Sequence, residues 1–395
     1  MNNLLTALKN ALQQGFRTLS GSLFLHRPRK SAFPLADRIL ADAFRLGQLP
    51  SPTEQEQVRA VFVAERLQAL NLPHTVDGSG NILARLHSYK DIMTDVTYEP
   101  LLVFTCLVSD RWNSLESLGR LELQYARGAG LADALGPAAL LSLAEAYASG
   151  RLAPDRELLL FFSARHFDDP YSDSFSLFTG DPRYRPAAAI GVQGFMLGFL
   201  TSHTLGSYRV ELGITEDEKQ KGDSNAVVNA LLDTAGRFRE LVKSPGGALR
   251  LYCRRIEAQS SFSRTPLEGV LELDLESADK GALDGALETI RNLAENSVFP
   301  GVKKSFRVVS SIPPGDPSVS EGLTRTLSEL MKELKIKAEE EAKPDPSSFL
   351  SALGIPALSV GIASGREGLN RDTVEIASIE KGRQLLERLV MVLGG

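Results

Sequence analysis

The chain of 395 residues is 43% hydrophobic and 24% charged, which is ample for one large core and a second, smaller one. Its net charge of −5 is spread without a long basic tract, so nucleic acid and anionic membrane are not expected as partners. Only two cysteines occur, Cys106 and Cys253, each within an apolar run typical of a buried strand, which excludes a disulfide framework.

Residues 1–16 carry apolar side chains at helical spacing, without the unbroken apolar core and cleavage site of a secretory signal. An amphipathic helix packed on the body of the protein is therefore favoured over attachment to a membrane or a partner. No apolar stretch in the chain approaches the roughly 20 residues of a membrane span. We expect a cytoplasmic protein.

Helices and buried strands alternate through the first half of the chain. Helical spacing predicts a helix over about 54–70, with Thr53 as its N-cap, and another over 135–150 that ends at Gly150. Unbroken apolar runs predict strands at 80–86, 101–108, 156–165 and 187–194. Such strands, separated by helices, indicate an α/β sandwich around a largely parallel sheet that is covered on both faces.

The pattern changes from about residue 206, where an amphipathic strand is followed by a charged loop. Beyond it the sequence predicts a helix, two strands, a helix and a strand, at 225–242, 247–256, 269–277, 280–297 and 304–312. This βαββαβ order suits a ferredoxin-like unit. A helix over 323–342, a strand over 357–363 and a helix over 379–393 then complete the first domain. We predict a discontinuous large domain, 1–205 and 313–395, with an inserted domain at 206–312.

Several motifs in this order resemble those of one enzyme family. PSPTEQEQVRAVFVAERLQALNL looks like its opening helix, DGSGNILARL like its D-x-x-G-N-x-x-A signature, and YARGAGLADALGPAALLSLAEAY like its glycine-rich turn and helix. GDSNAVVNALL and LGIPALSVGIA resemble the first helix of its lid and its closing strand. The chain thus resembles, over about residues 50 to 393, the dinuclear zinc metallopeptidases of the acetylornithine deacetylase, succinyl-diaminopimelate desuccinylase, aminoacylase, glutamate carboxypeptidase and peptidase T group.

The resemblance implies an α/β/α sandwich with an inserted lid domain that pairs with its copy in a homodimer. It also implies two zinc ions about 3.5–4 Å apart, bridged by a carboxylate, that activate water for amide hydrolysis. The residues at the family's metal-ligand positions, however, differ in this chain. The family's His-x-Asp falls on Cys106 and Val108, and the bridging Asp on Asp133, the one ligand that is unchanged.

The remaining family positions have also changed. The Glu-Glu pair of general base and ligand falls on Arg165 and His166, and a guanidinium cannot take a proton from water. The next carboxylate ligand falls on Gln193, a poor zinc ligand, and the lid Arg that binds substrate falls on Glu276. No His follows His203. We therefore expect neither zinc nor another cofactor.

Three functions remain open from the sequence. The first is a non-catalytic relative whose cleft, lined by Cys106, Asp133, Arg165, His166 and Gln193, binds a small peptide or carboxylate. The second is an amide hydrolase with one zinc ion at Cys106, Asp133 and His166. The third is a structural subunit that pairs through its lid domain. The alternative for these residues is structural: a buried Cys106, an Asp133 that caps its helix and a surface His166.

Overall fold

The computed structural model describes residues 34–51, 56–88, 99–109, 119–165, 174–200, 204–217, 225–241, 249–258, 265–296, 299–368 and 371–395. The expected amphipathic segment 1–16, the predicted N-cap Thr53, and both His166 and His203 lie outside these residues. Within the described part of the chain, no helix is long and apolar enough to cross a membrane.

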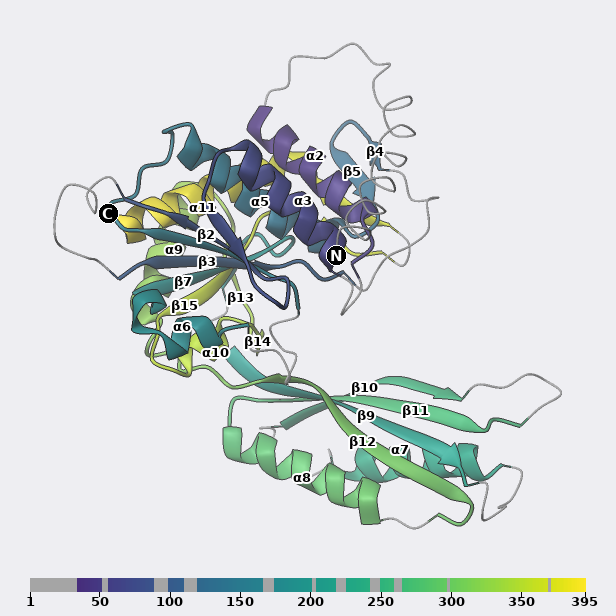
Figure 1. The fold of residues 1–395 in the computed structure, drawn as a ribbon. Helices are drawn as coiled ribbons and strands as arrows, with labels where there is room; N and C mark the ends of the chain where they lie inside the picture. Colours follow the sequence, from purple (N-terminus) through teal and green to yellow (C-terminus); the bar gives the residue numbers. More distant parts are fainter. Residues whose placement is uncertain are drawn as a thin grey trace.

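A six-stranded sheet forms the centre of the larger unit, in the order β1-β2-β6-β3-β7-β15 (Figure 1). The strands are β1 His74–Val76, β2 Ile82–Leu86, β6 Leu158–Ser163, β3 Leu101–Cys106, β7 Ala188–Gln193 and β15 Ala357–Gly361. The last four of these run parallel, and β1 and β2 form an antiparallel edge. Every residue of β6 and β15 is buried, which explains why their sequences are almost entirely apolar.

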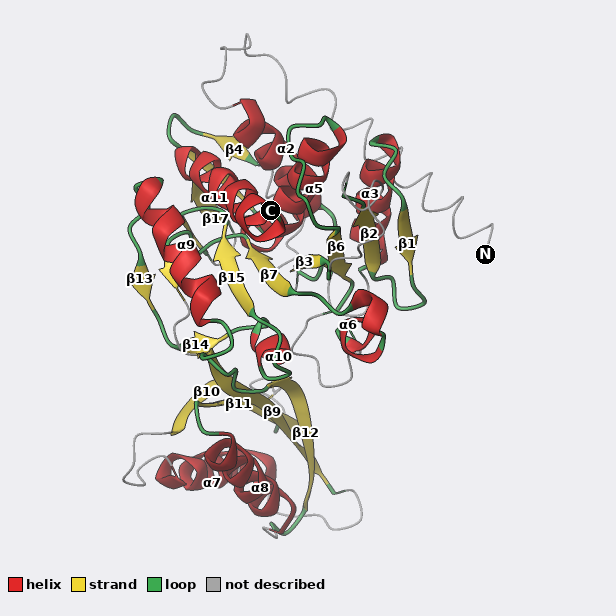
Figure 2. Ribbon diagram, turned by 90° about the vertical axis from the view of Figure 1, so that its left-hand side faces the viewer, coloured by secondary structure: helices red, strands yellow, loops and turns green. Residues whose placement is uncertain are grey.

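Helices cover both faces of this sheet (Figure 2). They are α2 Pro34–Gln48, α3 Gln57–Ala69, α5 Leu131–Ala148, α9 Glu321–Glu333 and α11 Ile376–Gly394 on one side, and α6 Ser176–Gly180 and α10 Ser348–Ser351 on the other. A short 3₁₀ helix spans Pro182–Tyr184. Successive strand residues alternate between two cores: Val103 and Phe162 belong to the first, Phe104 and Phe161 to the second. The predicted α/β sandwich with a mostly parallel sheet is confirmed.

The smaller unit is an antiparallel sheet in the order β10-β11-β9-β12 with α7 and α8 on one face (Figure 1). Its elements are β9 Thr204–Glu216, α7 Ala226–Leu241, β10 Leu249–Ala258, β11 Glu268–Ser277, α8 Lys280–Asn296 and β12 Val302–Ile312. This is the predicted βαββαβ order. The division at residues 206 and 312 into separately acting domains remains a prediction.

Short strands join the units and flank the larger sheet. β14 Lys343–Pro344 pairs in parallel with the start of β9, and β13 Glu339–Glu340 pairs with β8 Phe199–Leu200. A further small sheet has the order β16-β17-β5-β4. Its strands are β16 Gly365–Arg366, β17 Asp372–Glu375, β5 Tyr125–Gly128 and β4 Arg120–Leu121.

Two predictions about local structure were wrong. The helix predicted over 323–342 ends at Glu333, because Lys335 adopts a left-handed conformation with φ of 53° and Ile336 turns back to donate its N–H to the carbonyl of Met331 at 2.9 Å. Burial of Ile336 stabilises this end. Cys253 is exposed rather than buried, because β10 is an edge strand with an irregularity just after it.

Candidate functional site

The carboxyl ends of β6, β3 and β7 lie side by side at one edge of the large sheet, where parallel α/β sheets usually bind ligands. Cys106 ends β3 and lies opposite Ser163 of β6 in register. Arg165 follows Ser163 by two residues. The Cys106 thiol donates a hydrogen bond to the backbone carbonyl of Arg165 at 3.3 Å. The Cys106 sulfur accepts the N–H of Val108 at 3.4 Å. Cys106 and Arg165 therefore lie together, as the resemblance implied.

Asp133 reaches the same edge from the first turn of α5. Its Oδ2 accepts a hydrogen bond from the Ser109 hydroxyl at 2.7 Å. The helix begins after Gly130, which has a φ of 61°, a conformation that favours glycine. A Cβ at Gly130 would lie 3.3 Å from Ser109 Oγ and 3.7 Å from Arg59 Nη2. These three residues therefore meet closely beside Asp133.

Arg59 is the buried cation of this edge. Its residue is 1% exposed, and it projects from α3 to donate to the carbonyl of Leu107 at 3.0 Å and to that of Leu49 at 3.3 Å. Burial lowers the pKa of Arg59 to about 10, and the nearby Asp133 and Cys106 oppose this shift. The guanidinium thus keeps its positive charge at neutral pH.

Gln193 ends β7, the strand next to β3 in the sheet. The chain passes close to α5 here, because a Cβ on Gly194 would lie only 1.9 Å from the carbonyl oxygen of Ala132. The Gln193 amide donates to Asp345 Oδ2 at 3.2 Å. Asp345 is 0% exposed, and its other oxygen accepts the Ser347 N–H at 2.8 Å and the Ser359 hydroxyl at 2.8 Å. The carboxylate of this cluster therefore belongs to Asp345, behind the predicted ligand position.

A second buried carboxylate supports the start of α5. Asp372 of β17 is 2% exposed and accepts the backbone N–H of Ala132 at 3.0 Å. It thus satisfies a first-turn donor that α5 cannot pair internally, and its charge opposes the positive end of the helix dipole. Asp133 lies in the first turn of the same helix, after the N-cap Gly130, and accepts a hydrogen bond from Ser109, so the interpretation of Asp133 as a cap remains a prediction.

The predicted site residues divide into three groups. The structure brings Cys106, Asp133 and Arg165 to one edge, with Cys106 half-buried rather than enclosed. It directs Gln193 toward Asp345. His166 lies outside the described residues.

Sequence reasoning missed Arg59, Asp345 and Asp372. One signal was available for Arg59, which precedes the buried Val63 by four residues and so lies on the apolar face of α3. The two acids gave no such signal, because short acidic loop segments are usually solvated turns.

Glu276 of β11, at the position where the resemblance predicts the family's lid Arg, is buried in the smaller unit. Burial raises its pKa, and the guanidinium of Arg250, directly opposite on β10, lies 3.9 Å away and opposes the shift. A positive charge therefore comes from the neighbouring strand.

The described residues do not fit a pair of zinc ions. No group of three His, Cys, Asp or Glu side chains that could hold a metal ion occurs among them. The ligand positions described carry one carboxylate, one thiol and one amide, and Arg59 adds a buried positive charge. A single zinc ion at Cys106, Asp133 and His166 is not tested, because His166 lies outside this part of the chain.

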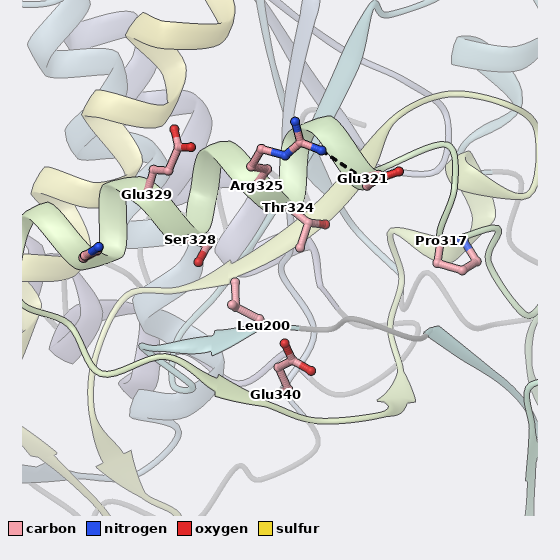
Figure 3. A pocket seen from close by; sticks show the side chains of 9 residues that line it. Leu200, Pro317, Glu321, Thr324, Arg325, Ser328, Glu329 and Glu340 are labelled. Atoms are coloured by element: carbon pink, nitrogen blue, oxygen red, sulfur yellow. Dashed lines mark hydrogen bonds and ion pairs between the residues drawn. The ribbon is translucent and has the colours of Figure 1, made fainter.

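An open groove of about 580 Å³ lies elsewhere, between α9 and the β8–β13 pair (Figure 3). Leu200 and Glu340 face Thr324 and Ser328 across it, and Arg325 pairs with Glu321 along the helix at 3.1 Å. None of the predicted site residues lines this groove.

We compared the sequence and the structure with those of known proteins. No family model matches the sequence, and no curated protein matches it. The aminopeptidase PepT from Bacillus cereus superposes with a TM-score of 0.62 at 10% identity, covering 91% of this chain and 99% of its own. A tripeptidase from Staphylococcus aureus gives a TM-score of 0.65 at 12% identity, covering 91% of this chain and 98% of its own.

A third structure is the YXEP protein of Bacillus subtilis, a dinuclear metal binding peptidase from the M20 family. It superposes with a TM-score of 0.56 at 13% identity and covers 91% of this chain and 98% of its own. The predicted resemblance to zinc peptidases is confirmed as a likeness of fold. This chain has the α/β fold of the M20 peptidases and amidases.

Proposed function

We propose that this protein is a non-hydrolytic relative of the zinc peptidases, which uses their fold to bind a small peptide or carboxylate without zinc. The observation that carries the proposal is the hydrogen bond from Gln193 to the buried Asp345. The resemblance leads us to expect that active members of the family have a carboxylate zinc ligand at the position that matches Gln193. Here that position carries a neutral amide whose donor group is directed at an acid.

The hydrogen bond between Gln193 and Asp345 links the amide at position 193 to a second residue of the site. A carboxylate at the partly buried position 193 would lie close to the fully buried Asp345, and two like charges at that distance repel each other. An amide removes the repulsion and donates a hydrogen bond to Asp345, and such bonds to ionised groups are stronger than neutral ones. The ligand position and Asp345 are therefore adapted to each other in a metal-free arrangement.

Arg165 supplies the ligand class in this proposal. It lies at the carboxyl end of β6, beside Cys106, and the resemblance assigns it to the position of the family's general base. A guanidinium cannot act as that base, but its planar donors match a carboxylate in two parallel hydrogen bonds. A peptide with a free carboxyl group, or an N-acyl amino acid, presents such a carboxylate.

Titration calorimetry with a panel of N-acetyl amino acids and dipeptides tests this function, with product analysis after long incubation with and without added zinc. We expect binding without hydrolysis. Arg165→Glu should abolish binding, whereas Arg165→Lys, which keeps the charge but not the fork, should weaken it. Unchanged binding by Arg165→Glu would remove the carboxylate receptor, and zinc-dependent release of products would remove the non-hydrolytic function.

The alternative, an amide hydrolase with one zinc ion, is favoured by one observation. Arg59 bonds to the carbonyl of Leu107, the residue after Cys106, and the Gly130 turn lies beside both Arg59 and the Ser109 hydroxyl that donates to Asp133, so Cys106 and Asp133 belong to one small region. With His166 they would give a thiolate, a carboxylate and an imidazole, all ordinary zinc ligands. Stoichiometric zinc that is lost in Cys106→Ser would support this alternative.

A further inference from the structure

We infer that Arg59 replaces the metal ions as the positive charge that holds the strand edge around Asp133 together. This inference rests on the proposed metal-free function. It assigns a role to a residue outside the predicted site, and its test does not depend on finding a ligand.

The position of Arg59 is the first argument. The carbonyl groups of Leu49 and Leu107, which accept its hydrogen bonds, follow α2 and β3 respectively. Its own backbone lies in α3, and the Gly130 turn, a few ångströms from Nη2, starts α5. One guanidinium, carried by α3, thus bonds to the chain that follows α2 and β3 and lies close to the start of α5. A metal ion in a working enzyme would likewise tie together side chains from several strand ends.

Charge is the second argument. The first turn of α5 brings the Asp133 carboxylate to this edge, and Ser109, which donates to it, is 3% exposed. The Asp133 side chain is partly buried, and a positive charge close to a partly buried carboxylate stabilises its ionised form. Arg59 has that charge, since its side chain remains protonated at neutral pH despite its burial. Lysine would lose its proton more readily on burial and has no rigid fork for two carbonyl groups.

Glu56 must be weighed as another partner. It is 3% exposed and precedes Arg59 by one helical turn, so its charge also faces this region. Arg66, two turns after Arg59 in α3, pairs with Asp42 of α2 at 2.9 Å. The inference therefore requires a test that separates Asp133 from Glu56.

A double-mutant cycle followed by thermal unfolding makes this separation. Arg59→Met removes the charge at similar volume, and we expect the melting temperature to fall by about 5 °C or more, because Asp133 is left without compensation. Adding Asp133→Asn should restore at least half of that loss. Adding Glu56→Gln to Arg59→Met is the matched control and should restore less.

Additive losses in the Arg59→Met/Asp133→Asn protein would overturn the inference, as would a rescue by Glu56→Gln alone. Should Arg59→Met fail to fold, single variants at Asp133 decide the question. Asp133→Asn should then lower the melting temperature clearly more than Ser109→Ala, which removes a hydrogen bond to Asp133 but leaves its charge. Equal losses of melting temperature in these two variants would overturn the inference and leave Arg59 only its hydrogen bonds to the carbonyl groups of Leu49 and Leu107. These outcomes are independent of zinc content and of hydrolysis, which test the proposed function.

Discussion

Restoring a carboxylate at position 193 is the most informative single change, because it tests whether the family's ligand position is still usable. Gln193→Asp recreates the residue type expected for a zinc ligand. In this chain it faces Asp345, whose Oδ2 lies 3.2 Å from the Gln193 amide nitrogen. Gln193→Asn is the matched control, since it has the same length and shape as the aspartate without the charge.

The cost of the change can be estimated from Coulomb's law. The introduced carboxyl is one methylene shorter than Gln193, so the two carboxylates would lie about 4–5 Å apart. At an effective dielectric near 20, this costs about 3–4 kcal/mol, and partial solvent access at position 193 together with the Lys343 ammonium, which interacts with Asp345, reduces it to about 2–3 kcal/mol. Gln193→Asp should therefore be less stable than Gln193→Asn by about 2–3 kcal/mol at pH 8.

The difference should depend on pH with a defined sign. Repulsion raises the pKa of the introduced carboxyl in the folded state above its unfolded value. The penalty is thus complete above the raised pKa and disappears as pH falls and the carboxyl takes up a proton. Urea unfolding of both variants at pH 8 and pH 5 measures it. Equal stability at pH 8, or stabilisation of Gln193→Asp by zinc, would refute the reasoning.

Other predictions concern the supports of the site. Gly194→Ala should destabilise the fold by about 1–3 kcal/mol, because its Cβ would meet the Ala132 carbonyl, whereas Gly285→Ala in α8, with nothing within 4 Å, should be neutral or stabilising by up to about 1 kcal/mol; urea unfolding compares them. Asp372→Asn should cost about 1 kcal/mol by weakening the bond to the α5 N-terminus, and a value near zero would contradict this. The predicted homodimer through residues 206–312 should appear in light scattering as twice the chain mass, and Ile256→Lys on the exposed edge strand β10 should reduce it, whereas a monomeric wild-type protein would contradict it.

The arrangement of strands and helices followed from the sequence because its elements are strongly patterned. β6 and β15 are fully buried and mostly apolar, and α8 has clear helical spacing, so each could be placed within a few residues. The end of α9 was missed because Lys335 takes the left-handed position that glycine usually fills. The exposure of Cys253 was missed because burial of a strand depends on its place at the sheet edge, which local sequence does not encode.

The site was predictable only where a motif fixed the position. Cys106, Asp133 and Gln193 could be placed because each lies at the end of a strand or the start of a helix. The partners of these residues come from elsewhere: Arg59 precedes Asp133 by a large sequence separation, and Asp345 follows Gln193 by 152 residues. Such contacts arise from tertiary packing, which the local sequence around Asp133 and Gln193 does not encode.

The most direct test of a metal-free function is the zinc content of the purified, chelator-free protein by elemental analysis, before and after soaking in zinc and removing the excess. We predict fewer than about 0.1 zinc ions per chain in both samples, since Arg59 and Gln193 stand where charge neutralisation and a ligand are needed. About one zinc ion per chain, lost in Cys106→Ala or Asp133→Ala, would contradict the account and establish a remodelled metal site.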